Sequence, residues 1–464
     1  MNWLALALAL SPENMLLLGI VGVLILEIIA PQPRGANFIA LVAVGMATLL
    51  ATFLYLVRFV AEPFPGEFSV DPGTSLAKLV VLLLAIPVLM LSHRDFNRSA
   101  SYHILLLSSL YGACLLLSAD SYLTLFLGLE LLSLPVYVLV LIKHETAQTL
   151  EAALKYLVLG GAATATFLLG VALLYGGTAS LSLASFTIAL GLRDGMAITA
   201  VVLVLVAFFL KAAIVPFHAW APDAYESASV PVTAYMATIV KAAVLLAVLR
   251  IVGDVPLSGG VIGMLAVLPL VSIVWGNLAA MRQGSFRRMI AYSSIAHAGY
   301  LFYAFLGDGP GRYQAVMFYV LVYGLMNLLA FAGLPRDGDD ASRDRLDQLK
   351  GLFHRDPFGA SMIAIAMLSL AGIPPLPGFI AKFLIFKNVI AAGYTTYAVL
   401  GLVGSYLGIY FYLRVIQFLF MSPAADGEDE RVPARTHAAI GACLVCLLPA
   451  ILVAVFPGLL IGRV

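Results

Sequence analysis

Residues 368–383 read LSLAGIPPLPGFIAKF, so glycine and proline interrupt a long apolar segment shortly before a lysine. A proline inside a helix removes one backbone hydrogen bond and clashes with the preceding turn. Freed backbone groups at membrane depth are tolerated only where protein or a water-filled cavity surrounds them. The segment therefore predicts a broken transmembrane helix with Lys382 just beyond the break.

A second interruption lies earlier, where residues 208–223 read FFLKAAIVPFHAWAPD. Lys211 comes about one turn before Pro216, and His218 lies just after that proline. Corresponding interruptions in two halves of a membrane protein are a sequence-level indication of its ion site.

The composition indicates a polytopic membrane protein. Of the 464 residues, 62% are hydrophobic and 11% are charged, and the mean hydropathy is +1.02. Soluble domains are nearer ~45–50% apolar and ~25% charged. The N-terminal residues lack the basic region of a signal peptide, so we expect no cleavage. The three cysteines are expected to pack in apolar surroundings and not to bind metal.

Hydropathy over a window of about 19 residues predicts an all-α protein with about 14 transmembrane helices, each near the ~20 residues that cross a bilayer. The expected spans are 13–30, 37–60, 74–92, 102–119, 121–142, 152–175, 196–216, 230–252, 258–281, 287–306, 313–334, 357–393 (interrupted), 395–420 and 435–458.

The two interruptions also predict an internal repeat. Spans four to eight and nine to thirteen form two units of five, and an odd number of crossings inverts one unit relative to the other. The broken helix is then the fourth member of both units. The expected divisions are N-terminal helices in 1–101, a first repeat in 102–254, a second repeat in 255–420 with the cytoplasmic loop 335–356, and a C-terminal loop and helix in 421–464.

Lysine and arginine in the connections predict the orientation. With the N-terminus outside, the cytoplasmic loops carry roughly 14 of these residues and the outer loops roughly 5, as the positive-inside rule requires. Both termini are therefore expected on the outer side.

Five charged residues lie within otherwise apolar spans: Glu130, Lys155, Lys211, Lys241 and Lys382. A charge at bilayer depth costs ~2.5–3.5 kcal/mol on the insertion scale, so such residues usually mark an ion or proton route. One carboxylate cannot neutralise four ammonium groups, which disfavours a static set of ion pairs. A buried lysine can instead change its protonation state, as a proton relay requires.

Other polar residues in the spans allow two interpretations. His218 and His297 can pass protons, since histidine titrates near neutral pH, or can be neutral residues packed by hydrogen bonds. Tyr406, Tyr410 and Tyr412 suit an interfacial belt or helix packing. Lys78 lies near a span end, where its side chain is expected to reach the interface.

The sequence also resembles a known family. Five runs in order are similar to the antiporter-like membrane subunits of respiratory complex I over nearly the whole chain, most of all to subunit N of bacterial NADH:quinone oxidoreductase; the runs are 127–135, 150–156, 215–223, 292–297 and 368–383. The resemblance implies that Glu130 and Lys211 form a first charged pair with Lys155 nearby, that Lys241 is the central relay, and that Lys382 is the terminal site. Lysine at position 382 fits subunit N or M better than subunit L.

The resemblance further implies a proton-translocating subunit of a translocase in the bacterial cytoplasmic membrane. NADH, FMN, iron–sulfur clusters and quinone would bind in partner subunits, with no cofactor, metal or nucleic acid bound by this chain. The partners would be other membrane subunits of complex I and the lipid bilayer. Two alternatives stay open: a cation/proton antiporter subunit of a multi-subunit sodium/proton exchanger, or the equivalent subunit of a hydrogenase or ferredoxin-linked quinone reductase.

Overall fold

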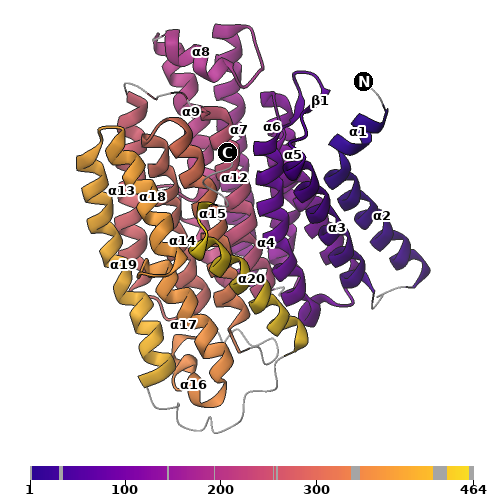
Figure 1. Ribbon diagram of the computed structural model, residues 1–464, viewed down its shortest axis with the longest axis vertical. Coiled ribbons are helices and arrows are strands. Elements are labelled where there is room, and N and C mark those ends of the chain that lie inside the picture. Colours follow the sequence, from indigo (N-terminus) through magenta and orange to yellow (C-terminus); the bar gives the residue numbers. More distant parts are fainter. Residues whose placement is uncertain are drawn as a thin grey trace.

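Long apolar helices make up almost all of the computed structural model (Figure 1). The structure describes residues 3–458 except 31–34, 144–145, 193, 254, 256, 258–259, 336–344 and 422–435. Within these residues, thirteen helices are long and apolar enough to cross a membrane. They are α2 (Ser11–Ile29), α3 (Ala36–Leu56), α4 (Pro72–Phe96), α5 (Ala100–Leu117), α6 (Tyr122–Leu141), α7 (Ala147–Thr178), α9 (Gly195–Ala212), the continuous helix Val230–Val252, α13 (Gly260–Ala280), α14 (Phe286–Tyr303, extended to Leu306 by a 3-10 turn), α15 (Gly309–Ala332), α19 (Thr395–Met421) and α20 (His437–Val455).

The helix Val230–Val252 has three parts, namely α11 (Val230–Tyr235), a π-helical segment (Met236–Val240) and α12 (Lys241–Val252). The remaining elements are α1 (Trp3–Ala9), the strands β1 (Ala61–Phe64) and β2 (Phe68–Val70), α8 (Ser185–Leu192), α10 (Trp220–Ser227), a 3-10 helix (Leu346–Leu349), α16 (Leu352–Arg355), α17 (Pro357–Ala371) and α18 (Pro377–Ala391).

Both predicted helix breaks are present. The first separates α9 from α10, and the second separates α17 from α18. Gly372 ends α17 with a φ of 86°, in the left-handed region that favours glycine. With the broken pair α17/α18 counted as one crossing, the thirteen long helices complete the predicted set of about 14.

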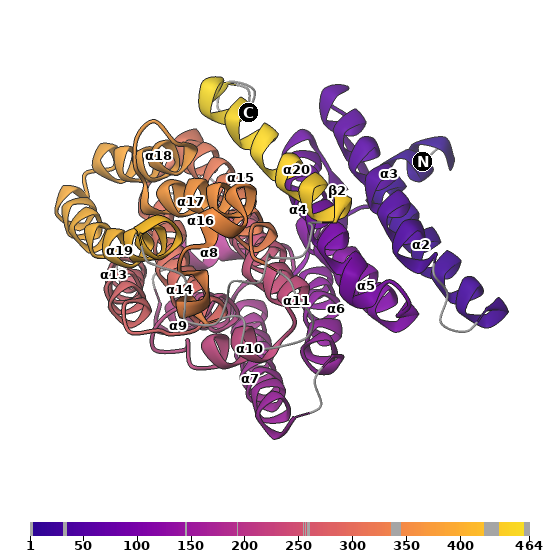
Figure 2. The same cartoon turned by 90° about the horizontal axis from the view of Figure 1, so that it is seen from below.

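The helices with the least lipid exposure lie in the centre of the bundle. The membrane-length windows of Val230–Val252 and α15 are fully buried, whereas those of α2 and α20 are largely exposed. In Figure 2, α2 and α3 lie at one edge of the bundle and α13 and α19 at the other. Figure 2 also shows α20 lying across α4 and α15, against which it packs.

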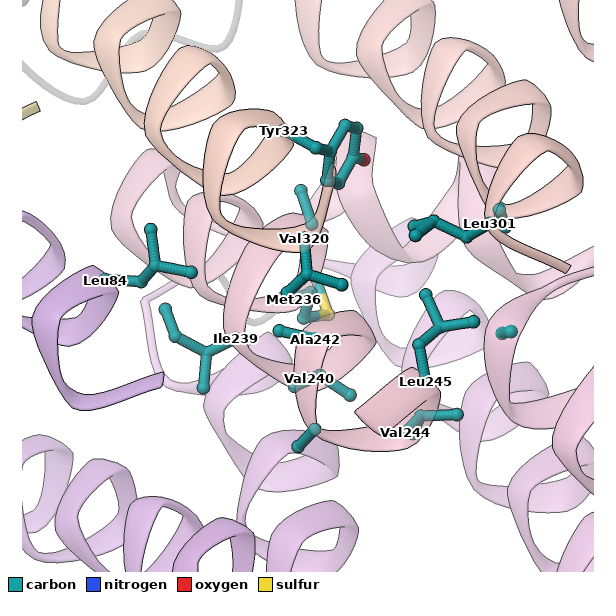
Figure 3. Packing of buried hydrophobic residues seen from close by; sticks show 14 of the residues in the cluster. Leu84, Met236, Ile239, Val240, Ala242, Val244, Leu245, Leu301, Val320 and Tyr323 are labelled. Carbon is teal, nitrogen blue, oxygen red and sulfur yellow. The ribbon is translucent and has the colours of Figure 1, made fainter. Parts of the chain in front are cut away.

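Apolar side chains fill the space around the central helix. Met236 and Ile239 pack toward Val320 of α15 and Leu84 of α4, and Leu245 lies on the side of Leu301 of α14 (Figure 3). Because dense packing restricts movement, this core holds the polar residues of neighbouring turns in fixed positions.

The two ends of the bundle differ. We call the end that carries the β1–β2 hairpin and α8 the hairpin end, and the opposite end, which carries α16, the loop end (Figure 1). Residues 336–344 of the predicted loop 335–356 lie outside the described residues, as do several arginines of the charge count: Arg34, Arg193, Arg336, Arg343, Arg431, Arg435 and Arg463. The orientation across the membrane and the domain boundaries stay predictions.

The prediction that the Lys78 side chain reaches the membrane interface is wrong. Its side chain does not reach the interface but is fully buried, and its Nζ lies 2.6 Å from Oε1 of Glu13. Glu13 lies in the first turn of α2, and Lys78 lies in the second turn of α4, so two separate helices contribute the pair. Hydropathy describes one helix at a time and therefore could not indicate this contact.

Candidate proton-transfer site

The structure brings Glu130 and Lys211 together. Lys211, in the last turn of α9, places Nζ 3.5 Å from Oε1 of Glu130 on α6. Lys211 also donates to Ser133 Oγ at 3.1 Å, and Thr164 of α7 donates to the Glu130 carboxylate. A cation in the last turn of a helix is favoured by the helix dipole, so the break after Ala212 helps to hold this ammonium group.

The pair is unevenly buried. The Lys211 side chain is 6% exposed and the Glu130 side chain is 23% exposed. The carboxylate therefore lies at the edge of the protein, and the amine lies in its interior. Glu130 is therefore the more accessible member of the pair.

Lys155 makes its ion pairs elsewhere. Its Nζ lies 2.8 Å from Glu151 and 2.8 Å from Asp223, and its side chain is 44% exposed. Arg288 of α14 pairs with Asp223 and with Glu226, each at 2.8 Å. These contacts join α7, α10 and α14, so Lys155 belongs to a charged cluster that the sequence did not indicate.

Asp223 is the centre of this cluster. Burial acts to raise its pKa, but the hydrogen bonds from Lys155 and Arg288 outweigh burial and hold the pKa below its usual value. Asp223 is therefore a stable anion at neutral pH, which suits a fixed link between helices better than a proton carrier.

Lys241 lies in the middle of the protein and is buried. It donates to the backbone oxygen of Ser294 at 2.8 Å and also to the Ser294 hydroxyl. It directly follows the π-helical segment Met236–Val240, a distortion that is frequent at functional sites. Its hydrogen-bond partners are neutral oxygen atoms, which favour the charged amine less than a carboxylate would.

His297 lies one turn beyond Ser294 on α14 and has a partner on each ring nitrogen. Nδ1 is 2.8 Å from the Tyr319 hydroxyl, and Nε2 is 2.9 Å from the Tyr412 hydroxyl. Tyr412 also hydrogen-bonds with Ser293 at 2.5 Å. An imidazole with a polar partner on both sides can accept a proton on one nitrogen and release it from the other.

Lys382 occupies a site built by the second helix break. Its Nζ donates to the backbone oxygen of Ala371, the last residue of α17, at 3.0 Å, and to Ser405 Oγ at 3.1 Å. The same nitrogen lies 5.1 Å from the centre of the Tyr300 ring. A side chain at Gly372 would lie only 3.1 Å from Cδ of Lys382, so glycine also leaves room for the lysine.

His218 lies between α9 and α10, where it is half-buried. Its Nε2 accepts a hydrogen bond from Trp275 Nε1 of α13 at 3.0 Å. Burial lowers its pKa, so the neutral ring is favoured at this position. The contact with Trp275 suits a packed neutral residue, and the structure does not bring His218 into hydrogen-bond contact with Lys211 or Lys241.

The sequence interpretation missed Tyr412 as part of the site. Tyr406 and Tyr410 are exposed, as a belt or surface position requires, but Tyr412 is buried against His297. The spacing of the sequence could have indicated that Tyr412 is buried. Ser405, Gly408 and Tyr412, which are all buried in α19, recur at intervals of three and four residues and so share one face of the helix. Within the described residues, no group of three or more His, Cys, Asp or Glu side chains is placed to hold a metal ion.

These observations define a class of protein. Many membrane-length helices, two helix breaks, and buried lysines within the bundle are features of a membrane protein that moves ions.

Comparison with known proteins agrees with this class. Residues 119–408 match the family "NADH:quinone oxidoreductase/Mrp antiporter, TM". NADH-quinone oxidoreductase subunit N of Pelobacter propionicus is 39% identical over 92% of this chain and 91% of its own length. A chain of respiratory complex I from Thermus thermophilus, solved with bound aureothin, is 34% identical, with a TM-score of 0.84 over 97% of this chain and 98% of that one. A chain of the Mrp complex from Dietzia sp. is 22% identical with a TM-score of 0.85 over 100% and 96%, which shows the shared fold alone.

The chain therefore belongs to the family of NADH-quinone oxidoreductase subunit N, an antiporter-like membrane subunit of complex I. The resemblance inferred from the sequence is confirmed, as is the role of a proton-translocating membrane subunit.

The Glu130–Lys211 pair gives a first testable prediction. Glu130→Gln keeps the size of the side chain but removes the negative charge beside Lys211, so we expect proton uptake to fall at least roughly tenfold, which corresponds to about 1.4 kcal/mol in the barrier. Glu130→Asp keeps the charge but changes the separation, so its effect should be milder. The measurement is NADH-driven proton uptake by membrane vesicles, normalised to the amount of assembled subunit. Equal activity of the two variants would remove the electrostatic explanation.

Proposed function

We propose that protons pass through this subunit along a line of buried side chains, from Glu130 and Lys211 through Lys241 and His297 to Lys382. The proposal rests mainly on the surroundings of His297. Each ring nitrogen of His297 hydrogen-bonds with a tyrosine hydroxyl, and the residue lies between the sites of two buried lysines. Lys241 reaches Ser294, one turn away on the same helix. Lys382 lies over Tyr300, whose ring is 5.5 Å from the ring of His297.

The energetics of buried charge support this line. Each lysine is held by oxygen atoms of neighbouring helices, so either protonation state can be accommodated without a large movement of the backbone. A proton that arrives at one amine raises the electrostatic energy of a proton on the next, because like charges repel strongly in a medium of low dielectric. Movement along the line is therefore stepwise.

The energy would come from redox chemistry in partner subunits. NADH, FMN, iron–sulfur clusters and quinone would bind there, and this subunit would lie in the bacterial cytoplasmic membrane with both termini on the periplasmic side. The exposed Lys155 cluster suits contact with another membrane subunit, since a half-exposed ammonium group at membrane depth is otherwise costly.

The experiment that tests this function is purification of the intact complex in mild detergent, followed by reconstitution into vesicles. We expect proton uptake that requires both NADH and quinone and that continues without a sodium gradient. Identification of the co-purifying subunits would establish the electron donor. Proton movement driven by sodium alone, without quinone reduction, would contradict the proposal and support the sodium/proton exchanger.

A further inference from the structure

A second Glu–Lys pair lies outside the segment that matches the family model, which begins at residue 119. Glu13 and Lys78 approach to 2.6 Å, with side chains that are 4% and 0% exposed. Removing two charges from water costs several kcal/mol per ion, and an apolar pair of similar volume would often serve packing equally well. The pair therefore calls for an explanation other than packing.

Two hydroxyl groups with free hydrogen-bonding capacity lie on α4 and at the end of α5. Ser75 is one turn before Lys78 on α4, and Ser118 directly follows the last residue of α5, one turn after Cys114. Both hydroxyl oxygens are buried and have no hydrogen-bond partner among the described residues. Cys114 of α5 is within electrostatic reach of both Glu13 and Lys78, so α5 lies beside the ion pair as well. A hydroxyl is both donor and acceptor and can pass a proton.

A cavity at the hairpin end lies beside this group. Its volume is about 230 Å³, and helices α4, α5, α12 and α15 enclose it. Polar groups of Asp71, Arg250 and Tyr313 line it, and Arg250 lies 3.5 Å from Asp71. Since a water molecule occupies about 30 Å³ of liquid, the cavity can hold several.

The cavity and the ion pair share helix α4. Three residues of the cavity wall are direct chain neighbours of the polar group: Thr74 precedes Ser75, Ala77 precedes Lys78, and Leu117 precedes Ser118. Lys78 therefore lies on the helix that forms part of the cavity wall.

We propose that Glu13 and Lys78 form a further proton-transfer site of this subunit, which exchanges protons with the cavity at the hairpin end. In the transfer, an N–H bond of the Lys78 ammonium group breaks and an O–H bond forms on Glu13, which leaves both side chains neutral. The reverse step restores the ion pair. The titratable groups that face the pair are Tyr111 and Cys114 of α5, and the Phe68 ring of β2 covers Lys78 at 5.0 Å.

The inference rests on the proposed proton translocation and adds a location to it. With the predicted orientation, the hairpin end faces the outer side, so the pair would lie where protons leave the subunit. The family-matched segment contains the line from Glu130 to Lys382, and the N-terminal helices would contribute a separate outlet.

The sharpest test is Lys78→Arg in the intact complex. Arginine keeps the positive charge and the ion pair but cannot release its proton, so a static pair tolerates the change and a proton-transfer site does not. We expect NADH-driven proton uptake to fall at least roughly tenfold, since a positioned acid or base typically contributes ~10²–10⁴-fold. The matched control is Lys143→Arg, which changes another intramolecular ion pair, 2.9 Å from Asp95, and should leave uptake unchanged.

The double variant Glu13→Leu with Lys78→Met covers the case in which arginine does not fit. Replacing both members of a buried pair by apolar residues is often neutral for stability, so the complex should assemble. A loss of proton uptake in the assembled double variant supports the proposal. Wild-type uptake in either assembled variant overturns it. If these variants keep wild-type uptake while Lys241→Ala abolishes it in the same assay, the proposed outlet is wrong and the proposed function stands.

Access to the cavity can be tested separately. The Ala77→Cys variant should react with a membrane-impermeant maleimide added from the hairpin side, whereas the Ala85→Cys variant, changed deeper on the same helix, should not. The three native cysteines are buried, so their background labelling should be low. An unreactive cysteine at position 77 would contradict exchange between this cavity and the aqueous phase.

Discussion

Lys241→Ala is expected to lower NADH-driven proton uptake at least roughly tenfold, since a positioned acid or base commonly contributes a hundredfold or more to a proton-transfer rate. Its amine donates to Ser294, one turn from His297, and in the proposed line it comes between Lys211 and His297. Alanine offers no proton acceptor, and the distance between the two neighbouring sites becomes too long for a direct transfer. Quinone reduction should fall as well if the two processes are tightly coupled.

Assembly should survive this substitution. The lysine is buried without a carboxylate partner among its described hydrogen bonds, so its removal also removes a desolvation cost. The measurement is proton uptake by reconstituted vesicles, alongside the content of each subunit. Lys387→Ala is a suitable control, because Lys387 lies on α18 with its side chain exposed. Wild-type uptake in an assembled Lys241→Ala complex would be incompatible with a relay through this residue.

The order of the helices and the positions of the breaks could be predicted because their causes are local. Apolar runs of about 20 residues specify spans, and Gly372 with its flanking prolines specifies a break, without reference to any other helix. The predicted positions of the helix ends were less accurate. The span expected at 152–175 begins earlier, at Ala147, because the Thr146 side chain caps the helix through the backbone N–H of Thr149. Hydropathy does not detect such a cap.

The partners of the buried charged residues could not be predicted from the composition or from the spacing of apolar residues along each helix. Lys155 contacts Asp223, which is 68 positions away in the sequence, and His297 contacts Tyr412, which is 115 positions away. Such contacts depend on how helices rotate and cross, and a single sequence gives no direct measure of either. The pairing of Glu130 with Lys211 was expected only through the resemblance to a family.

The break between α17 and α18 gives the second large prediction. In a continuous helix, the carbonyl of Ala371 would accept a hydrogen bond from the N–H of residue 375. Proline at position 375 has no N–H, and the carbonyl instead accepts from Lys382 Nζ at 3.0 Å. The lysine site therefore exists because the helix cannot close its own hydrogen bonds.

Pro374→Ala combined with Pro375→Ala is expected to impair transport more than folding. The new N–H groups would compete with Lys382 for the freed carbonyls, and the amine would lose the partner that holds it beside Tyr300. We expect proton uptake to fall roughly fivefold or more, equivalent to about 1 kcal/mol in a rate barrier. Thermal stability of the complex should change little, since Pro374 and Pro375 lie in the non-helical segment between α17 and α18 and contribute no backbone N–H to either helix.

The measurement combines proton uptake, a melting curve and a high-resolution structure of the variant with ordered waters. Pro449→Ala is the matched control, since Pro449 lies inside α20 and belongs to a helix that contributes none of the residues in the proposed line. Full uptake by the double variant would show that proton transport does not depend on the helix break. A continuous helix with reduced uptake would instead establish that this subunit keeps the break because unpaired backbone carbonyls hold Lys382 in a position to exchange protons.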